Sequence, residues 1–269
     1  MGLIRMLPNG SSISYPRRGP EVPAKRGRVR GWTAASARSN VRFLWSVESE
    51  SLGEGGHALT LTMGGRPSTS VEWSTARARL LQRLREAETS RYHWVTEWTA
   101  AGRPHLHMAL WNQGASSVDL ALMWLEICDS MGWPATLSGQ HVEDIFDATG
   151  WLKYVAKHSA RGVQHYQRET PPEGWGTTGR LWGASRTGWP RAEEEGVYLS
   201  AKQTARLREG FVLWQAQRML DEGVPSATVD AYLENLDAPP EVGAPPRGVS
   251  GWIPWETARA LVMDATEFE

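Results

Sequence analysis

The feature that most constrains the fold is a hairpin signal between residues 94 and 111. Two strand-like runs, Trp94–Thr99 and Pro104–Trp111, are separated by a four-residue connection that contains Gly102. A connection this short joins antiparallel neighbours, so the two runs must pair with each other in a sheet. The hairpin therefore predicts an antiparallel sheet. The end of the first hairpin strand would lie opposite the start of the second.

Periodicity places further elements on either side of the hairpin. The expected strands are Val41–Val47, His57–Met63 and Gln140–Ile145, and the expected helices are Thr75–Glu88, Ser117–Met131 and Thr149–Arg161. This order predicts an α+β fold of the ferredoxin-like (RRM-like) sort, with a central antiparallel sheet and helices mainly on one face.

Charge is distributed unevenly along the chain, although the formal net charge is only −1. Residues 1–42 hold nine basic and one acidic residue, and residues 219–269 hold two basic and ten acidic residues. Because Pro and Gly interrupt the basic stretch, we expect a basic flexible leader over residues 1–40. The folded domain is then expected over 41–190, followed by a helical C-terminal extension over 191–269 with an acidic tail.

The basic leader has two interpretations. Arg26, Arg28 and Arg30 would contact the phosphates of a nucleic acid, or the segment would only be a solubilising tail. The sequence has no long apolar run, so we expect no membrane-spanning segment and no membrane partner. The single Cys128 cannot form an intramolecular disulfide, which favours a reducing compartment.

Two histidines near the start of the second hairpin strand are candidate metal ligands. His105 and His107 are two residues apart, so a strand directs both side chains to one face. Neutral imidazoles in this arrangement can bind Mn²⁺, Mg²⁺ or Zn²⁺. Glu97 lies across the turn and would add a carboxylate. The alternative is an incidental pair on the surface.

A second motif lies on the helix expected at 149–161. Tyr154 and Lys157 are three residues apart, and such residues share one face of a helix. A tyrosine hydroxyl can attack a phosphodiester, and Lys153 and His158 add positive charge nearby for contact with DNA. The alternative is that Tyr154 only packs against the sheet.

Taken together, these strings resemble a known group of enzymes. The strand at 58–63, the hairpin with its histidines and the tyrosine helix appear in the order typical of the HUH endonucleases. They resemble in particular the rolling-circle replication initiators (Rep proteins) of small plasmids and single-stranded DNA phages. The string Gly179–Arg186 is also similar to a segment that follows the tyrosine helix in Rep proteins.

The resemblance implies roles for individual residues. His105 and His107 would hold a divalent metal, Mg²⁺ or Mn²⁺, with Glu97 as the third ligand. Tyr154 would be the nucleophile that forms a 5′-phosphotyrosine, and Lys157 would balance charge on the phosphate. Many phage-type initiators carry a second tyrosine four residues after the first, but this chain has His158 there, which implies a single-tyrosine enzyme.

The resemblance also implies partners and a location. The substrate would be single-stranded origin DNA in the cytoplasm of a prokaryotic host cell. The sequence contains no Gly-x-x-x-x-Gly-Lys-Ser/Thr string, so unwinding and synthesis would fall to a host helicase and polymerase. Two other functions stay open: a single-tyrosine HUH transposase or relaxase, and a non-catalytic DNA-binding autorepressor.

Overall fold

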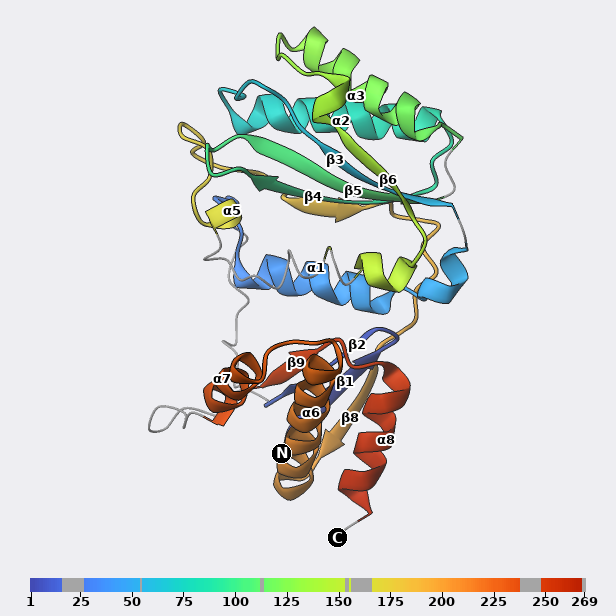
Figure 1. Ribbon diagram of the computed structural model, residues 1–269, viewed down its shortest axis with the longest axis vertical. Helices are drawn as coiled ribbons and strands as arrows, with labels where there is room; N and C mark the ends of the chain where they lie inside the picture. Colours follow the sequence, from blue (N-terminus) through green and yellow to red (C-terminus); the bar gives the residue numbers. More distant parts are fainter. Residues whose placement is uncertain are drawn as a thin grey trace. The chain divides into compact units, whose positions relative to one another are not determined.

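The structure is a computed structural model that describes residues 1–15, 27–53, 55–111, 114–152, 155, 166–237 and 248–267. It divides into two compact units (Figure 1). The terminal unit takes its described residues from Met1–Pro23, Trp45–Glu48 and Arg191–Glu269. The central unit takes them from Ala24–Leu44 and Ser49–Pro190.

The central unit is built on a five-stranded antiparallel sheet. Its strands run in the order β6 (His141–Ile145), β3 (Gly56–Leu61), β5 (Pro104–Trp111), β4 (Arg91–Trp98) and β7 (Trp182–Ala184). The first four give the strand order of a ferredoxin-like domain, because β3, α2, β4, β5, α3 and β6 follow one another along the chain. The sequence-based fold class is therefore confirmed.

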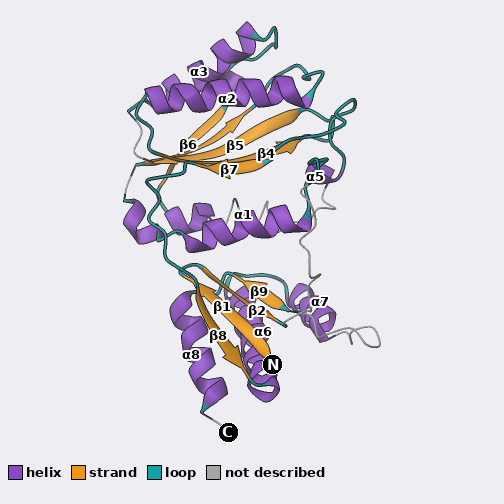
Figure 2. Ribbon diagram, turned by 180° about the vertical axis from the view of Figure 1, so that it is seen from behind, coloured by secondary structure: helices purple, strands orange, loops and turns teal. Residues whose placement is uncertain are grey.

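Two long helices cover one face of this sheet (Figure 2). Helix α2 (Ser70–Glu86) begins after Thr69, whose side chain accepts a hydrogen bond from the backbone N–H of Glu72. Helix α3 (Ser117–Ser130) begins after Ser116, which forms a capping box with Asp119. Apolar side chains of both helices and of the strands form one buried core that includes Trp73, Leu80, Leu106, Met108 and Trp124.

The opposite face of the sheet is partly covered by a helix where a strand was predicted. Residues 41–47 are not a strand, because Ala34–Ser46 forms helix α1. The buried residues Asn40, Phe43 and Leu44 follow the helical spacing i, i+3, i+4. The ring of Phe43 stacks on that of His93 in β4, with centroids 5.6 Å apart. The apolar run at 41–47 is too short for its sequence to distinguish this helical period from a strand.

Shorter elements complete the central unit. They are the 3₁₀ turns Ser49–Leu52 and Leu137–Gly139 and the single helical turn α5 (Tyr166–Glu169). Of the helix predicted over Thr149–Arg161, residues 149–152 and 155 are described, and they are helical. Leu152 and Val155 are buried there.

The terminal unit has a sheet of its own. Its strand order is β8 (Glu195–Leu199), β1 (Gly2–Leu7), β2 (Gly10–Ser14) and β9 (Val249–Gly251), all antiparallel. The predicted helical C-terminus is confirmed as α6 (Ala201–Asp221), α7 (Ser226–Asp237) and α8 (Trp255–Thr266). Ile4, Ile13, Phe211 and Val262 belong to the core between sheet and helices.

The prediction of a flexible leader over residues 1–40 is wrong for most of the residues described there. Gly2–Leu7 and Gly10–Ser14 are paired strands, and Ala34 begins α1. The error has a physical cause: β1 pairs with β8 and β2 pairs with β9, so the partners lie at the other end of the chain. Among the described helices, none is long and apolar enough to span a lipid bilayer.

Candidate metal centre

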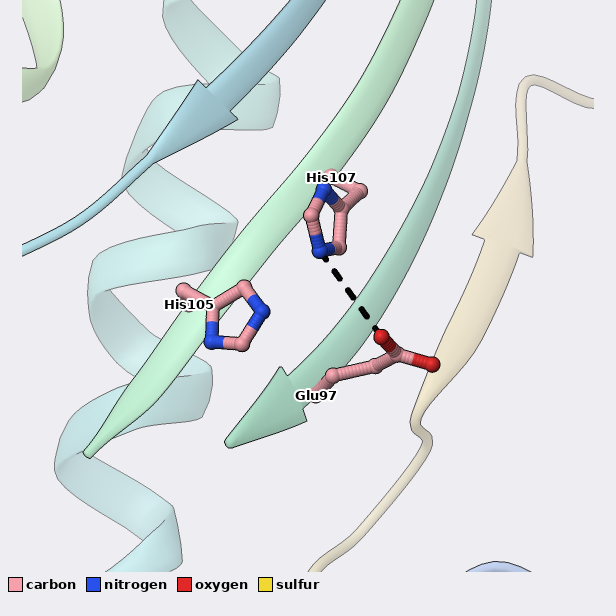
Figure 3. A group of neighbouring side chains, drawn as sticks. All are labelled: Glu97, His105 and His107. Carbon is pink, nitrogen blue, oxygen red and sulfur yellow. Dashed lines mark ion pairs between the residues drawn. The ribbon is translucent and has the colours of Figure 1, made fainter. Parts of the chain in front are cut away.

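The structure brings Glu97, His105 and His107 together on one face of the central sheet (Figure 3). His105 and His107 lie on β5, and Glu97 is directly opposite His105 in the β4–β5 register. Residues two apart on one strand, and residues directly opposite on neighbouring strands, point to the same face. The short turn at 99–103 sets this register, so local sequence is enough to assemble the group.

The geometry of the group suits a cation. One ligand atom of each residue lies within 4.8 Å of the others. His107 Nε2 is 3.7 Å from Glu97 Oε2, and the two imidazole rings are nearly perpendicular, with centroids 4.7 Å apart. The side chain of Glu97 is 1% exposed and that of His107 is 11% exposed. Two imidazole nitrogens and one carboxylate form a donor set that divalent ions of the first transition row and Mg²⁺ accept.

His107 is oriented by a neighbouring strand. Its Nδ1 lies 3.0 Å from the hydroxyl oxygen of Thr60, which is opposite His107 in the β3–β5 register. When Nδ1–H donates to Thr60, the lone pair of Nε2 points toward Glu97, which is the tautomer that a metal ligand requires. Thr60 thus belongs to the site, although it was not a predicted site residue.

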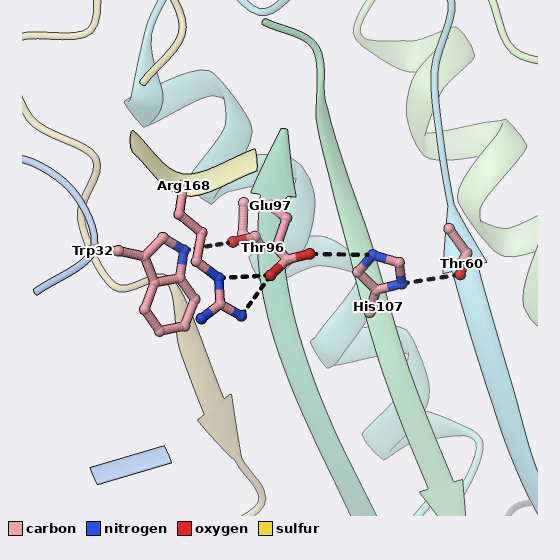
Figure 4. Close-up of polar contacts among 6 residues, drawn as sticks. All are labelled: Trp32, Thr60, Thr96, Glu97, His107 and Arg168. Carbon is pink, nitrogen blue, oxygen red and sulfur yellow. Dashed lines mark hydrogen bonds and ion pairs between the residues drawn. The ribbon is translucent and has the colours of Figure 1, made fainter. Parts of the chain in front are cut away.

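Glu97 has a partner that the sequence did not predict. Nε of Arg168 donates a hydrogen bond to Glu97 Oε1 at 2.7 Å, and Nη2 donates to the same oxygen (Figure 4). Both side chains are 1% exposed, so this is a buried ion pair. Because Oε1 accepts both bonds, Oε2 is the oxygen that faces His107.

An aromatic ring supports this arginine. The guanidinium carbon of Arg168 lies 4.3 Å from the centroid of the Trp32 ring. Trp32 in turn donates from Nε1 to the backbone oxygen of Thr96 at 3.1 Å. No local signal could have identified Arg168, because it lies 71 residues after Glu97 in a loop-rich region. The pair follows from tertiary structure alone.

The remaining predicted residues are placed only in part. Arg28 and Arg30 are exposed. Arg26, Lys153, Tyr154, Lys157 and His158 lie outside the described residues. The roles assigned to them stay predictions from the sequence.

Comparisons with known proteins give the family. The sequence profile of the replication-associated protein ORF2/G2P family matches residues 56–161. A protein of Xylella fastidiosa strain 9a5c that is named as a replication protein is 45% identical over 181 residues, which are 65% of this chain and 62% of that protein. The chain therefore spans less than two thirds of the length of that relative.

Two further relatives are covered more fully. A protein of Xylella fastidiosa strain Temecula1, also named as a replication protein, is 42% identical over 185 residues, or 66% of this chain and 69% of its own. Replication-associated protein G2P of Pseudomonas phage Pf3 is 37% identical over 195 residues, which are 71% of this chain and 70% of that protein. No solved structure matches the chain. With this identity over more than two thirds of two such proteins, the chain belongs to the replication-associated protein ORF2/G2P family.

Proposed function

We propose that this protein initiates rolling-circle replication by nicking single-stranded origin DNA and later rejoining it. The observation that carries the proposal is the group of Glu97, His105 and His107, which has the donors of a divalent metal site. The family supports replication as the process, ahead of transposition, conjugation or simple repression.

The three ligands would hold Mg²⁺ or Mn²⁺. The bound cation would supply Lewis-acid polarisation of the scissile phosphate. Glu97 contributes Oε2, because Arg168 holds Oε1 through two hydrogen bonds. Thr60 keeps Nε2 of His107 directed into the site. Arg168 and Thr60 thus act as positioning residues for the ligands.

Tyr154 is the proposed nucleophile. Its phenolic oxygen would form a bond to phosphorus while the bond from phosphorus to the 3′ oxygen breaks. The phenol proton leaves to solvent, and the departing oxygen takes up a proton to become a free 3′-OH. The product is a 5′-phosphotyrosine, which a DNA 3′-OH can later attack to rejoin the strand. Lys157, three residues on, would balance charge on the phosphate.

An adduct assay tests this function. Single-stranded oligonucleotides tiled across the replicon would be incubated with the protein and Mn²⁺, and covalent complexes separated by denaturing electrophoresis. Tyr154→Phe should abolish the adduct and rejoining while metal binding is retained. Mass spectrometry should find the nucleotide on Tyr154.

A matched control is available in the terminal unit. Tyr198 is 67% exposed, so Tyr198→Phe should leave the adduct at the wild-type level. An adduct on another tyrosine, or cleavage that leaves a free 5′-phosphate, would contradict the mechanism. The single-stranded origin, a host helicase and a host polymerase are the partners that the proposed function requires.

A further inference from the structure

A row of arginines without carboxylate partners lies along the β7 edge of the central sheet. We call them the β7-edge arginines: Arg28, Arg30, Arg77, Arg85, Arg180 and Arg186. Within the described parts of the chain, none of them forms an ion pair with a carboxylate. An unpaired cation at a surface is ordinary, but one of these six is buried.

The buried member is Arg77 on α2, which is 7% exposed. Its guanidinium carbon lies 4.1 Å from the centroid of the Trp94 ring, and its Nη1 donates to the hydroxyl of Thr96 at 3.4 Å. Neither partner carries a negative charge. Burial, and then the nearby charge of Arg180, lowers the pKa of Arg77 to about 10, so it stays charged at neutral pH. The ring of Trp94 and the hydroxyl of Thr96 stabilise this buried charge, and its field adds to that of the exposed arginines beside it.

Two backbone hydrogen bonds bring exposed arginines close to Arg77. The N–H of Thr96 donates to the carbonyl of Leu181 at 2.7 Å, which holds Arg180 beside the end of β4. The N–H of Thr178 donates to the carbonyl of Val29 at 2.8 Å, and Arg28 and Arg30 flank Val29. This is the end of β4 that carries Glu97. The side chain of Thr96, which Arg77 contacts, points to the α2 face, whereas that of Glu97 points to the opposite face. Positive charge therefore gathers on the α2 side of the sheet edge, across from the candidate metal centre.

The segment 179–183 is shaped to lie against α2 and β4. Gly179 has φ +65°, and a Cβ there would be 3.5 Å from the hydroxyl of Ser74 on α2. A Cβ on Gly183 would be only 2.8 Å from the ring of Trp94, so a larger residue could not lie there without displacement. These two glycines keep Arg180 close to Arg77 and place β7 over the aromatic ring that Arg77 stacks on.

The other end of the row lines a cavity. A space of about 530 Å³ is bordered by Arg85, Arg186, Glu88, Tyr92 and the hydroxyl residues Thr89, Ser90, Ser185 and Thr187. Glu88 makes no ion pair with either arginine within the described residues. Two guanidinium groups among hydroxyls suit a phosphate ester. Arg77 and Arg85 are eight residues apart on one helix, or roughly 12 Å along its axis.

We propose that the β7 edge binds the phosphate backbone of single-stranded DNA on one side of the nick site. The strand would leave the candidate metal centre, pass around the end of β7 at Arg28, Arg30 and Arg180 to the α2 face, and reach the cavity lined by Arg85 and Arg186. The inference rests on the proposed function for the identity of the ligand. It deepens that function by giving the flanking strand a path on the protein.

Salt-dependent binding of a homopolymer tests the path without any knowledge of the nick site. The probe is oligo(dT) of about 30 nucleotides, followed by fluorescence anisotropy without metal over a range of salt concentrations. Each phosphate contact on a single strand contributes roughly 0.7 to the slope of log K against log salt. The double variant Arg180→Ala/Arg186→Ala should therefore bind more weakly, with a slope reduced by about 1.4.

A control with the same change of charge exists on α2. Arg79 donates to Ser130 and Arg83 pairs with Glu126, so both face α3. Arg79→Ala/Arg83→Ala should leave the slope at the wild-type value. Equal slopes in the two double variants would overturn the proposal. If oligo(dT) binding behaves as expected but no tiled oligonucleotide is nicked, the nicking function fails and the binding path stands.

Discussion

Arg168 and Glu97 form a buried ion pair in which two guanidinium nitrogens donate to a single carboxylate oxygen. Because both side chains are 1% exposed, neither charge is stabilised by bulk water. The pair keeps Glu97 in one orientation, with its second oxygen toward His107.

Arg168→Met should destabilise the protein strongly. Removing one partner of a buried pair leaves an uncompensated charge, which typically costs about 3–5 kcal/mol. Urea unfolding would measure the loss. Mn²⁺ should restore part of it, because a cation at Glu97 replaces the missing positive charge. The double variant Glu97→Gln/Arg168→Met should be more stable than the two single losses added together, and simple additivity would contradict the pairing.

Thr60→Val should weaken metal binding while leaving the fold intact. The hydroxyl that meets Nδ1 of His107 is lost, and losing such an orienting partner typically lowers metal affinity about 10- to 100-fold. Titration calorimetry with Mn²⁺ would measure the change. Thr60→Ser keeps the hydroxyl and should bind like the wild type. Equal affinities in the Val and Ser variants would show that Thr60 does not orient the histidine.

The free energy of unfolding should decrease as the pH is lowered, because of His93. Burial lowers the pKa of His93 to about 3, whereas the unfolded chain takes up the proton near 6.5. The contribution is complete above pH 6.5 and is lost as the pH falls toward 3, by up to about 1.4 kcal/mol per pH unit. Unfolding midpoints at pH 7, 6 and 5 would measure it.

Two histidine variants isolate the contribution of His93. His93→Gln keeps a donor toward Asn40 but cannot titrate, so its midpoints should depend less on pH. His141 is 67% exposed, and His141→Gln should keep the wild-type dependence. The same pH dependence in both variants would refute the assignment.

Deleting residues 1–14 should unfold the terminal unit. β1 and β2 are the two central strands of its sheet, and without them β8 and β9 lose their neighbours. Ile4, Met6 and Ile13 would also leave the core. Limited proteolysis should then cut within 195–237 and 248–267, where the full-length chain should resist. Arg28→Ala/Arg30→Ala, which changes charge alone, should leave that resistance intact.

Local sequence was enough to predict the hairpin and the group of Glu97, His105 and His107. A short turn fixes which residues are opposite, and alternation fixes the face. The terminal sheet and the pairing of Arg168 with Glu97 could not be predicted from local sequence, because each depends on a partner far away along the chain. α1 was missed for another reason: its apolar residues at 41–47 are too few to distinguish a helical period from a strand.

The turn between β4 and β5 has a consequence for insertions and deletions. The N–H of Thr99 donates to the carbonyl of Arg103 at 2.8 Å, and Gly102 has φ +68°, so the turn is tightly closed. One residue more or less would shift the pairing, and a shift by one sends every side chain of the shifted strand to the opposite face. Glu97 and the histidines would then face different sides of the sheet. The exposed residues of the turn can therefore vary, but a change in its length would separate the three candidate metal ligands.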